Sequence, residues 1–265
     1  PRTPGLSPDQ LVHVGERLID VFELRVFRYD ASTLHTQTGQ SIDDCLAFAQ
    51  QGPAAWIQVI GLHEVELIAQ FAEALNIHLL VREDILNTQH RPKLETHDDF
   101  IFAANKLLSW DDQTDSFSTT QLSVILKKQL VISFHESEPD QFVPLIKRLR
   151  QDNGRLRKLG SDYMFWALLD TALDHHFPVL DRFDRQLAIL EEQLESKTDL
   201  IDSSEIFSFR RNVMNLCNTI RPLREMAARI QRLDSPLITE KTTAFFQDLA
   251  DNAWHAIDAI DALRE

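Results

Sequence analysis

Glycine is scarce in this sequence and is absent from its second part. The 265 residues include seven glycines, and the last of them is Gly160. Because glycine supplies turns and helix ends, its absence from residues 161–265 predicts a few long helices there. The first part, by contrast, is expected to hold shorter elements joined by many turns. We therefore divide the chain into an α/β region, 1–160, and a long-helix region, 161–265.

Cysteine and long apolar runs are also scarce. Cys45 and Cys217 are the two cysteines, and no CxxC spacing is present, so the sequence indicates a reducing compartment and argues against a disulfide framework or a thiolate zinc site. No run approaches the roughly 18 apolar residues of a membrane helix, and no signal-peptide pattern opens the chain. Since the first residue is Pro1, we expect a trimmed N-terminus on a soluble, cytoplasmic piece of a longer protein.

An excess of basic residues is missing as well. The net charge is −14, which argues against nucleic acid as a partner because phosphates need neutralising cations. The hydrophobic content of 43% and the 16 phenylalanines predict a packed interior and not a disordered acidic chain. The acidity leaves carboxylates available for divalent cations or basic partners.

The common catalytic motifs are absent. The sequence contains no GxSxG, no P-loop, no GxGxxG and no HExxH, and His63-Glu64 lacks the second histidine of a zinc site. His175 and His176 are adjacent, so on a helix their side chains diverge by about 100° and are poorly placed to share a metal. We predict solvated or interfacial roles for this pair, and we predict that the chain is not an enzyme.

The α/β region alternates strand-like and helix-like segments. Ser41 with Asp44 predicts the start of a short helix. This alternation favours a mixed β-sheet covered by helices. Strands are expected over residues 21–29, 54–60, 99–108, 119–126 and 129–134, and further helices over residues 64–75, 79–86 and 141–149.

The long-helix region opens with a predicted antiparallel helical hairpin, 161–233. Apolar residues recur at steps of three and four from Leu173 to Leu194, interrupted by Pro178, which should kink the helix and leave it otherwise intact. A polar loop over residues 196–201 should reverse the chain, and Asp202 with Glu205 should start the next helix. Apolar residues then keep a nearly unbroken heptad over residues 206–230, which predicts one continuous helix.

The last predicted helix occupies residues 236–265 and carries one apolar and one acidic face. Thr239 is its expected N-cap. No stop signal follows, so we expect the helix to continue past Glu265 as a truncated stalk. The apolar stripe consists of Phe246, Leu249, Ala253, Ala256, Ile257, Ile260 and Leu263. The acidic stripe consists of Asp248, Asp251, Asp258 and Asp261.

A second acidic face carries Asp170 and Asp174, one helical turn apart. Carboxylates outnumber lysines and arginines in the long-helix region, and most of its arginines fall in one predicted helix, so some acidic groups should stay unneutralised. Two carboxylates about 4 Å apart repel by a few kcal/mol at an effective dielectric of about 20, and a hard cation would relieve this. The ordinary alternative is a solvated acidic surface, which is the commoner use of helix carboxylates.

The run REDILNTQHRPKLE, residues 82–95, resembles the LEDILN…RPK signature of the CorA family of divalent-cation channels. This run is one of several matching segments, each of which is a weak signal alone. Their common order and spacing make the resemblance strong, and together they cover nearly the whole chain after about residue 50. The similarity continues through WIQVIGLH (56–63), GRLRKLGSDYMFWALLDTALDHHFPVLD (154–181), IRPLRE (220–225) and SPLITEKTTAFFQDLADNAWHAID (235–258).

This resemblance implies a homopentameric, magnesium-gated channel of the cell inner membrane that carries Mg²⁺, with Co²⁺ and Ni²⁺ as further ions. The chain would be its cytoplasmic domain. The stalk would lead into two transmembrane helices and a Gly-Met-Asn pore motif beyond Glu265. The family also implies a regulatory Mg²⁺, replaceable by Co²⁺ or other divalent cations, bound between neighbouring subunits and stabilising the closed state.

The resemblance also assigns the expected metal ligands. Asp84 corresponds to the aspartate of the signature, and Asp248 to its partner on the stalk of the next subunit, whereas Glu83 and Asp170 match positions of a second site. Where some members have a histidine four residues after the stalk aspartate, this chain has Asn252, which removes a nitrogen ligand that suits cobalt.

Two other functions are compatible with the residues. One is a helical scaffold or binding protein whose acidic faces are merely solvated. The other is a carboxylate metallohydrolase with Asp170, Asp174 and Asp248 around a catalytic metal. The hydrolase needs three ligands converging within one chain, whereas the channel needs its ligands to meet across subunits.

Overall fold

The computed structural model describes residues 11–39, 41–151, 154–195 and 203–264. Strands and short helices fill the first part of the chain, and long helices follow from Ser161 onward, as the glycine distribution predicts. The elements are β1 (Glu23–Tyr29), β2 (Leu34–Gly39), α1 (Ile42–Ala49), β3 (Ala54–Ile60), α2 (Val65–Ala74), α3 (Leu79–Leu86), β4 (Lys93–Thr96), β5 (Ile101–Asp111), β6 (Ser116–Lys127), β7 (Leu130–His135), a 3₁₀ turn (Asp140–Phe142), α4 (Val143–Arg150), α5 (Arg155–Lys158), α6 (Ser161–Asp174), α7 (His176–Glu195), α8 (Ser203–Ile220), α9 (Leu223–Gln231) and α10 (Glu240–Ala262).

The strands form one mixed seven-stranded sheet in the order β2-β1-β3-β7-β6-β5-β4. Within it β3 and β7 pair in parallel, with Ala55 opposite Leu130, and the other neighbours pair antiparallel. The predicted fold class, a mixed sheet covered by helices and followed by long helices, is therefore confirmed. The edge strand β2 escaped prediction because its sequence, LHTQTG, is polar and has no buried residue, which leaves no alternating apolar signal.

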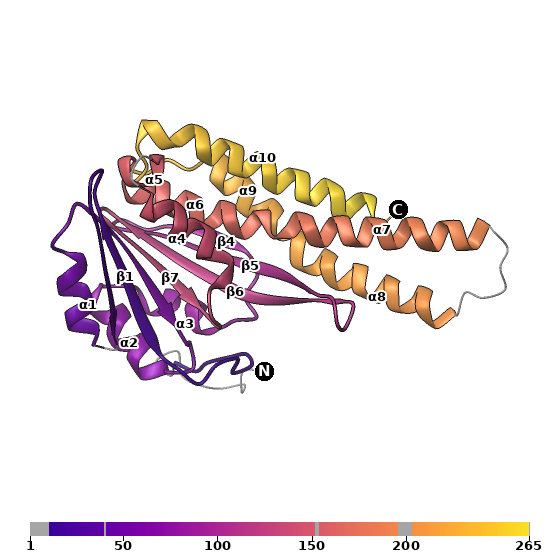
Figure 1. The fold of residues 1–265 in the computed structure, drawn as a ribbon, viewed down its shortest axis with the longest axis horizontal. Coiled ribbons are helices and arrows are strands. Elements are labelled where there is room, and N and C mark those ends of the chain that lie inside the picture. The colour runs from indigo at the N-terminus through magenta and orange to yellow at the C-terminus, as the bar shows by residue number, and fades with distance from the viewer. Residues whose placement is uncertain (1–10, 40, 152–153, 196–202, 265) are drawn as a thin grey trace.

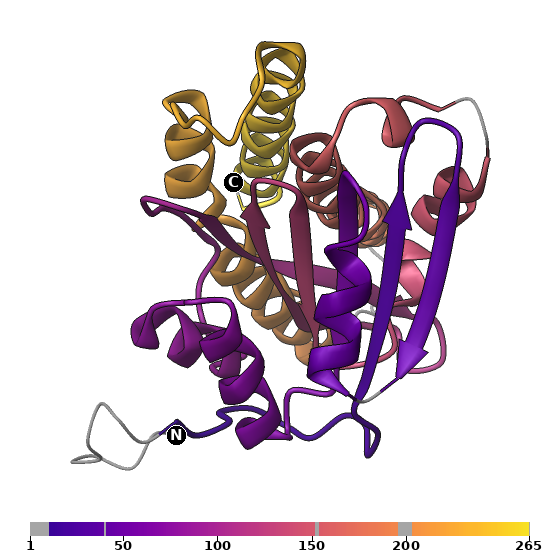
Figure 2. The same cartoon turned by 90° about the vertical axis from the view of Figure 1, so that its left-hand side faces the viewer.

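Helices cover both faces of the sheet (Figures 1 and 2). On one face, α1, α2 and α3 bury residues such as Cys45, Phe71 and Ile85 in a core with the sheet. On the other face, α4 and the long helices share a core with strand residues such as Trp56. Because that second core joins residues from both parts of the chain, residue 160 marks a change of element type within one packed unit.

The long helices are interrupted near two prolines, one as predicted and one not. Near Pro178 the chain leaves the helix for a single residue, between α6 and α7, in keeping with the predicted kink. The prediction of one continuous helix over residues 206–230 is wrong, because α8 ends at Ile220 and α9 begins at Leu223. Pro222 lies in that break: it has no N–H for the helical ladder, and its ring clashes with the preceding turn.

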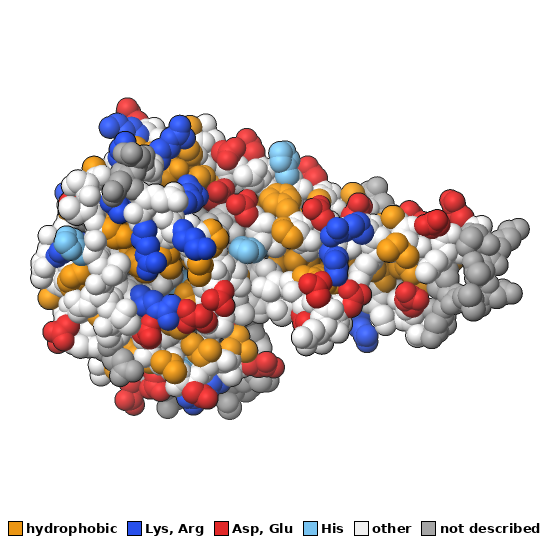
Figure 3. Space-filling model, viewed as in Figure 1, with side chains coloured by type: hydrophobic (Ala, Val, Ile, Leu, Met, Phe, Trp, Pro, Cys, Tyr) orange, Lys and Arg blue, Asp and Glu red, His pale blue; other side chains and the backbone are white. Residues whose placement is uncertain are grey.

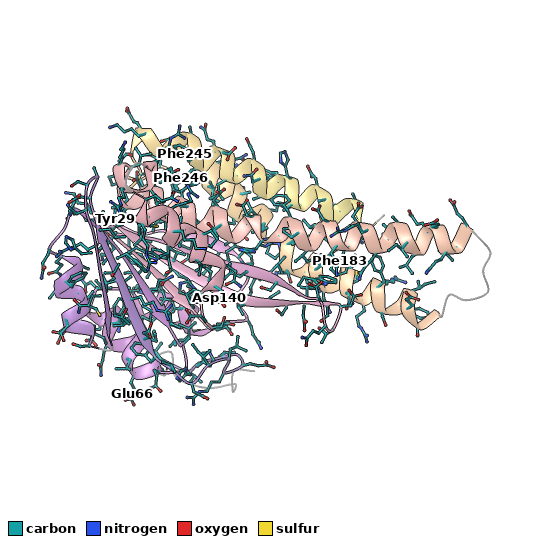
Figure 4. The ribbon with its side chains drawn as sticks, in the orientation of Figure 1. Tyr29, Glu66, Asp140, Phe183, Phe245 and Phe246 are labelled. Atoms are coloured by element: carbon teal, nitrogen blue, oxygen red, sulfur yellow. The ribbon has the colours of Figure 1, made fainter. Side chains whose placement is uncertain are left out.

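The far ends of α7 and α8 project past the sheet as an arm (Figure 1). Phe183 anchors the base of this arm, since its ring contacts Trp110 and Phe117 of the β5–β6 hairpin and Phe209 of α8 (Figure 4). Farther out, Leu194 and Ile206 are 57% and 38% exposed, so the predicted apolar seam does not extend to the tip. The predicted loop at 196–201 and the predicted cap Asp202 lie outside the described residues.

A buried carboxylate fixes the start of α10. Asp162, in the first turn of α6, accepts hydrogen bonds from the backbone N–H and the hydroxyl of Thr239, at 2.9 and 2.8 Å, and from the hydroxyl of Thr242, at 2.6 Å. Thr239 is the N-cap of α10, as predicted, and the predicted apolar stripe of that helix faces the core. Asp162 thus ties the first turns of α6 and α10 together.

Candidate functional site

Asp84 projects from α3 at the edge of the core between that helix and the sheet. His78 is the N-cap of this helix, and its ring Nδ1 accepts a hydrogen bond from the N–H of Leu80. Val81 and Ile85 bury the inner face of the helix. Asp84, lying between these two buried positions, leaves only 14% of its side chain exposed. The predicted helix bounds, 79–86 with Asn87 at the end, are confirmed.

Both oxygens of the Asp84 carboxylate are engaged by cationic or hydrogen-bonding neighbours. Lys93 Nζ lies 2.5 Å from Oδ2, and His90 Nε2 lies 2.7 Å from Oδ1. Burial alone would raise the pKa of Asp84, but the hydrogen bonds and positive charges of these two groups hold it below its usual value. The predicted ligand Asp84 is therefore ionised and already partnered within its own chain, which the sequence motif did not indicate.

The other predicted ligand of α3, Glu83, is half-buried and lines the same hollow as Asp84. That hollow has a volume of about 370 Å³ and opens beside the edge strand β4. Its lining combines carboxylates, one lysine and two histidines with two apolar side chains: His78, Leu80, Val81, Glu83, Asp84, Lys93, Glu95 and His97.

A second carboxylate group joins α6 to α10. Burial, together with the charges of Asp174 and Asp248 and against the opposing charge of Arg148, raises the pKa of Asp170 to about 6. The pKa of Asp174 is also raised, by burial and by Asp248, although His175 opposes the shift. The structure therefore brings Asp170, Asp174 and Asp248 within electrostatic reach of one another, although they are distant in sequence.

A basic surface borders this second group. Exposed lysines and arginines gather over α4 and α5, and acidic side chains adjoin them and continue along the long helices (Figure 3). Arg148 belongs to this surface and lowers the pKa of Asp170, so the two charge patches meet there. The basic residues are Lys147, Arg148, Arg150, Arg155 and Lys158.

The remaining stalk carboxylates do not act as one group. Asp251 and Asp258 are exposed, as a solvated face would be. Asp261 instead accepts hydrogen bonds from Arg221 and Arg224, at 2.8 and 3.3 Å. Within the predicted stripe, Asp261 is therefore neutralised by arginines of the α8–α9 junction, whereas Asp251 and Asp258 face solvent.

The adjacent histidines diverge, as predicted, but one of them is neither solvated nor interfacial. His176 is fully buried, and its Nδ1 lies 3.0 Å from the carbonyl oxygen of Ala172. Burial lowers the pKa of His176 to about 4, so the ring is neutral at pH 7. The prediction of a solvated or interfacial residue is wrong at His176, because the α6–α7 junction turns this ring into the core.

The two carboxylate groups lie on opposite faces of the sheet. The buried neighbours of Asp84 on α3 belong to the core with α1 and α2, whereas Leu169 of α6 and Leu249 of α10 belong to the other core. Asp84 and Asp248 therefore do not meet within one chain. In the described part of the chain, no set of three or more histidine, cysteine, aspartate or glutamate side chains is arranged to hold a metal ion. The same residues include no helix long and apolar enough to span a bilayer.

A sequence model described as CorA-like Mg2+ transporter protein matches residues 53–265. This match covers most of the chain. The chain belongs to the CorA family. The resemblance inferred from the sequence motifs is confirmed.

Individual relatives agree with this assignment. The cobalt/magnesium transport protein CorA of Thermotoga maritima is 31% identical over 261 residues, which are 98% of this chain and 74% of that protein. The solved soluble domain of CorA from Methanocaldococcus jannaschii is similar in fold, with a TM-score of 0.71 at 16% identity over 93% of this chain and 94% of that one. The complete CorA magnesium transporter of the same organism gives a TM-score of 0.70 at 18% identity, covering 93% of this chain and 74% of that one.

The raised pKa of Asp170, caused first by burial and then by the neighbouring carboxylates, leads to a prediction about pH. In metal-free buffer, Asp170→Asn is expected to raise the free energy of unfolding at pH 7.5 by about 1–2 kcal/mol, after discounting for solvent screening. The folded-state pKa of Asp170, about 6, lies above the usual value of 3.8. Ionisation of Asp170 therefore begins to destabilise the native state above pH 3.8, and the full destabilisation is reached above pH 6. Urea unfolding should therefore show a much smaller gain at pH 4.5. Equal gains at both pH values, or a similar gain from the exposed Asp181→Asn, would contradict this cause.

Proposed function

We propose that this chain is the cytoplasmic Mg²⁺-sensing and gating part of a CorA-type divalent-cation channel of the cell inner membrane. Its relatives carry the names of magnesium or cobalt/magnesium transport proteins, and the Thermotoga maritima protein is longer than this chain. We assign the membrane part to that additional length, as a continuation of the stalk helix α10. Transport of Mg²⁺, with Co²⁺ and Ni²⁺ as further ions, belongs to this proposal.

The observation that carries the proposal is the separation of Asp84 from Asp248 on opposite faces of one subunit. A cation bound by both carboxylates therefore has to lie between two subunits packed side by side, one supplying Asp84 and the other Asp248. In a closed ring, such as a homopentamer, every subunit would offer Asp84 to one neighbour and Asp248, with Asp170, to the other. A site of this kind couples the metal to the packing of the ring.

The donor set suits Mg²⁺. Carboxylate oxygens are hard ligands, and Mg²⁺ is usually held by one or two of them through retained waters. Asn252 lies one turn after Asp248 and is half-buried. Its amide oxygen can bind a hard cation, whereas its amide nitrogen is not a metal ligand. With Mg²⁺ bound, the facing carboxylates would bridge subunits and favour the closed ring; without it, their repulsion would loosen the ring.

This proposal predicts that millimolar Mg²⁺ protects the chain against limited proteolysis and that Asp248→Asn weakens the protection. A ligand that binds the assembled native state stabilises it by an amount that grows with its concentration over its dissociation constant. Digestion is compared in Mg²⁺ and in chelator at matched ionic strength. Equal rates would favour the alternative of a scaffold with solvated acidic faces.

A further inference from the structure

The ammonium group of Lys93 lies between two carboxylates of the hollow beside α3. Its Nζ is 2.5 Å from Oδ2 of Asp84 and 3.0 Å from Oε1 of Glu95. The Asp84 side chain is 14% exposed and that of Glu95 is 34% exposed. One cation of the protein therefore already occupies the position that a divalent cation bound to Asp84 would need.

The position of this ammonium is fixed by the sheet. Lys93 is the first residue of β4, where it pairs with Ala104 of β5, and its Nζ lies 5.4 Å from the ring centre of Phe102 on that strand. Only 20% of the side chain is exposed. Lys93 is thus a held group and not a freely moving surface lysine.

A metal ion at Asp84 would displace this contact. Oδ1 of Asp84 faces His90 and Oδ2 faces Lys93, so both oxygens have partners before any metal arrives. Two positive charges a few ångströms apart repel strongly at a half-buried site. Glu95 offers the displaced ammonium a second acceptor without any movement of the strand.

We propose that the ammonium of Lys93 competes with the divalent cation for Asp84, and that this ammonium is handed over to Glu95 when the metal binds. This competition lowers the affinity of Asp84 for divalent cations, so that the site responds only where such a cation is abundant. The inference rests on the proposed function, because it assumes that Asp84 takes part in binding the cation.

The test is a Mg²⁺ titration of the full-length, assembled protein by isothermal calorimetry, with Lys93→Met against wild type. Methionine keeps an unbranched stem on Phe102 and removes the charge. Lys127→Met is the matched control, since Lys127 is 19% exposed, pairs with Asp99 at 2.7 Å and lies 5.6 Å from the ring centre of Phe100. We expect the Mg²⁺ dissociation constant to fall about tenfold or more in Lys93→Met and to change less than about twofold in Lys127→Met.

Glu95→Gln tests the handover. In the wild-type background this change should weaken Mg²⁺ binding, because the displaced ammonium loses its second acceptor. In the Lys93→Met background it should have little effect, since no ammonium needs a new partner. Equal weakening in both backgrounds would show that Glu95 itself binds the metal and would overturn the handover.

The outcomes separate this inference from the proposed function. A wild-type assembly that shows no saturable Mg²⁺ binding would contradict the proposed function itself. If wild type binds Mg²⁺ saturably and Lys93→Met binds it equally or more weakly, only the proposed competition by Lys93 would be overturned. Lys93→Gln, which also removes the charge, serves as a second variant, and thermal unfolding verifies that each variant is folded.

Discussion

Replacing either Asp84 or Asp248 by asparagine is expected to remove most of the Mg²⁺-dependent closure of the full-length channel, and replacing both should add little. Groups that share one bound cation behave non-additively, because the first change already destroys the site. Each single change should raise the Mg²⁺ concentration that halves the flux by about tenfold to a hundredfold, the usual range for one charged contact. Ion flux into vesicles at high internal Mg²⁺ is the measurement.

Asp258→Asn is the matched control for this experiment. Asp258 lies on the same helix, α10, and is exposed, so its loss should leave Mg²⁺ inhibition unchanged. Wild-type inhibition in both single variants at Asp84 and Asp248 would show that these carboxylates are only solvated surface.

Mixed assemblies distinguish a site between subunits from two sites within them. When chains carrying Asp84→Asn assemble with chains carrying Asp248→Asn, some neighbours bring together an intact Asp84 and an intact Asp248. Mg²⁺ inhibition should therefore recover in part in the mixture, although each variant alone lacks it. No recovery in verified mixed rings would argue that the two residues act separately.

Asp162→Ala is expected to destabilise the chain by about 3 kcal/mol or more, the largest stability effect that we predict. Asp162 is 4% exposed, and its loss would remove the acceptor of three hydrogen bonds from Thr239 and Thr242. Each hydrogen bond to a charged group contributes about 1.5–3 kcal/mol, and the total is reduced because the Thr242 hydroxyl can still donate to the carbonyl oxygen of Thr239. Urea unfolding gives the total, and hydrogen exchange at the first turn of α10 should show where protection is lost.

Two further variants define what Asp162 does. Asp162→Asn can keep an acceptor oxygen toward the threonine donors but then places its amide NH₂ where Oδ1 accepts from the N–H of Tyr163, so its cost should lie between that of Asp162→Ala and zero. The exposed Asp258→Asn should stay within about 0.5 kcal/mol of wild type. A loss below 0.5 kcal/mol in Asp162→Ala would mean that α10 is anchored by its apolar face alone.

The sequence predicted best those elements whose signals are local. Helix α3 begins and ends where apolar spacing and Asn87 indicate, and β3 matches its apolar run, AAWIQVI. The edge strand β2 was missed because it forms through pairing with β1 and has no apolar pattern of its own. The break at Pro222 was missed because the heptad continues in register across it and hides the lost hydrogen bond.

The candidate site was only partly predictable, because its chemistry depends on packing across the chain. The motif identified Asp84, but the turn that brings His90 and Lys93 back onto its carboxylate has no signal in residue spacing. The raised pKa of Asp170 likewise arises from Asp248, far along the chain, which approaches only when α10 packs against α6. Predicting the ligands needed a motif, whereas finding their partners needed the fold.

The most direct measurement is anomalous diffraction from crystals of the full-length assembly grown with Mn²⁺ in place of Mg²⁺. Our account predicts a peak between subunits, bounded by Asp84 of one chain and Asp248 of its neighbour, with the ammonium of Lys93 moved away from Asp84 toward Glu95. A peak held entirely by Asp170, Asp174 and Asp248 of a single chain, or no peak near Asp84, would contradict it.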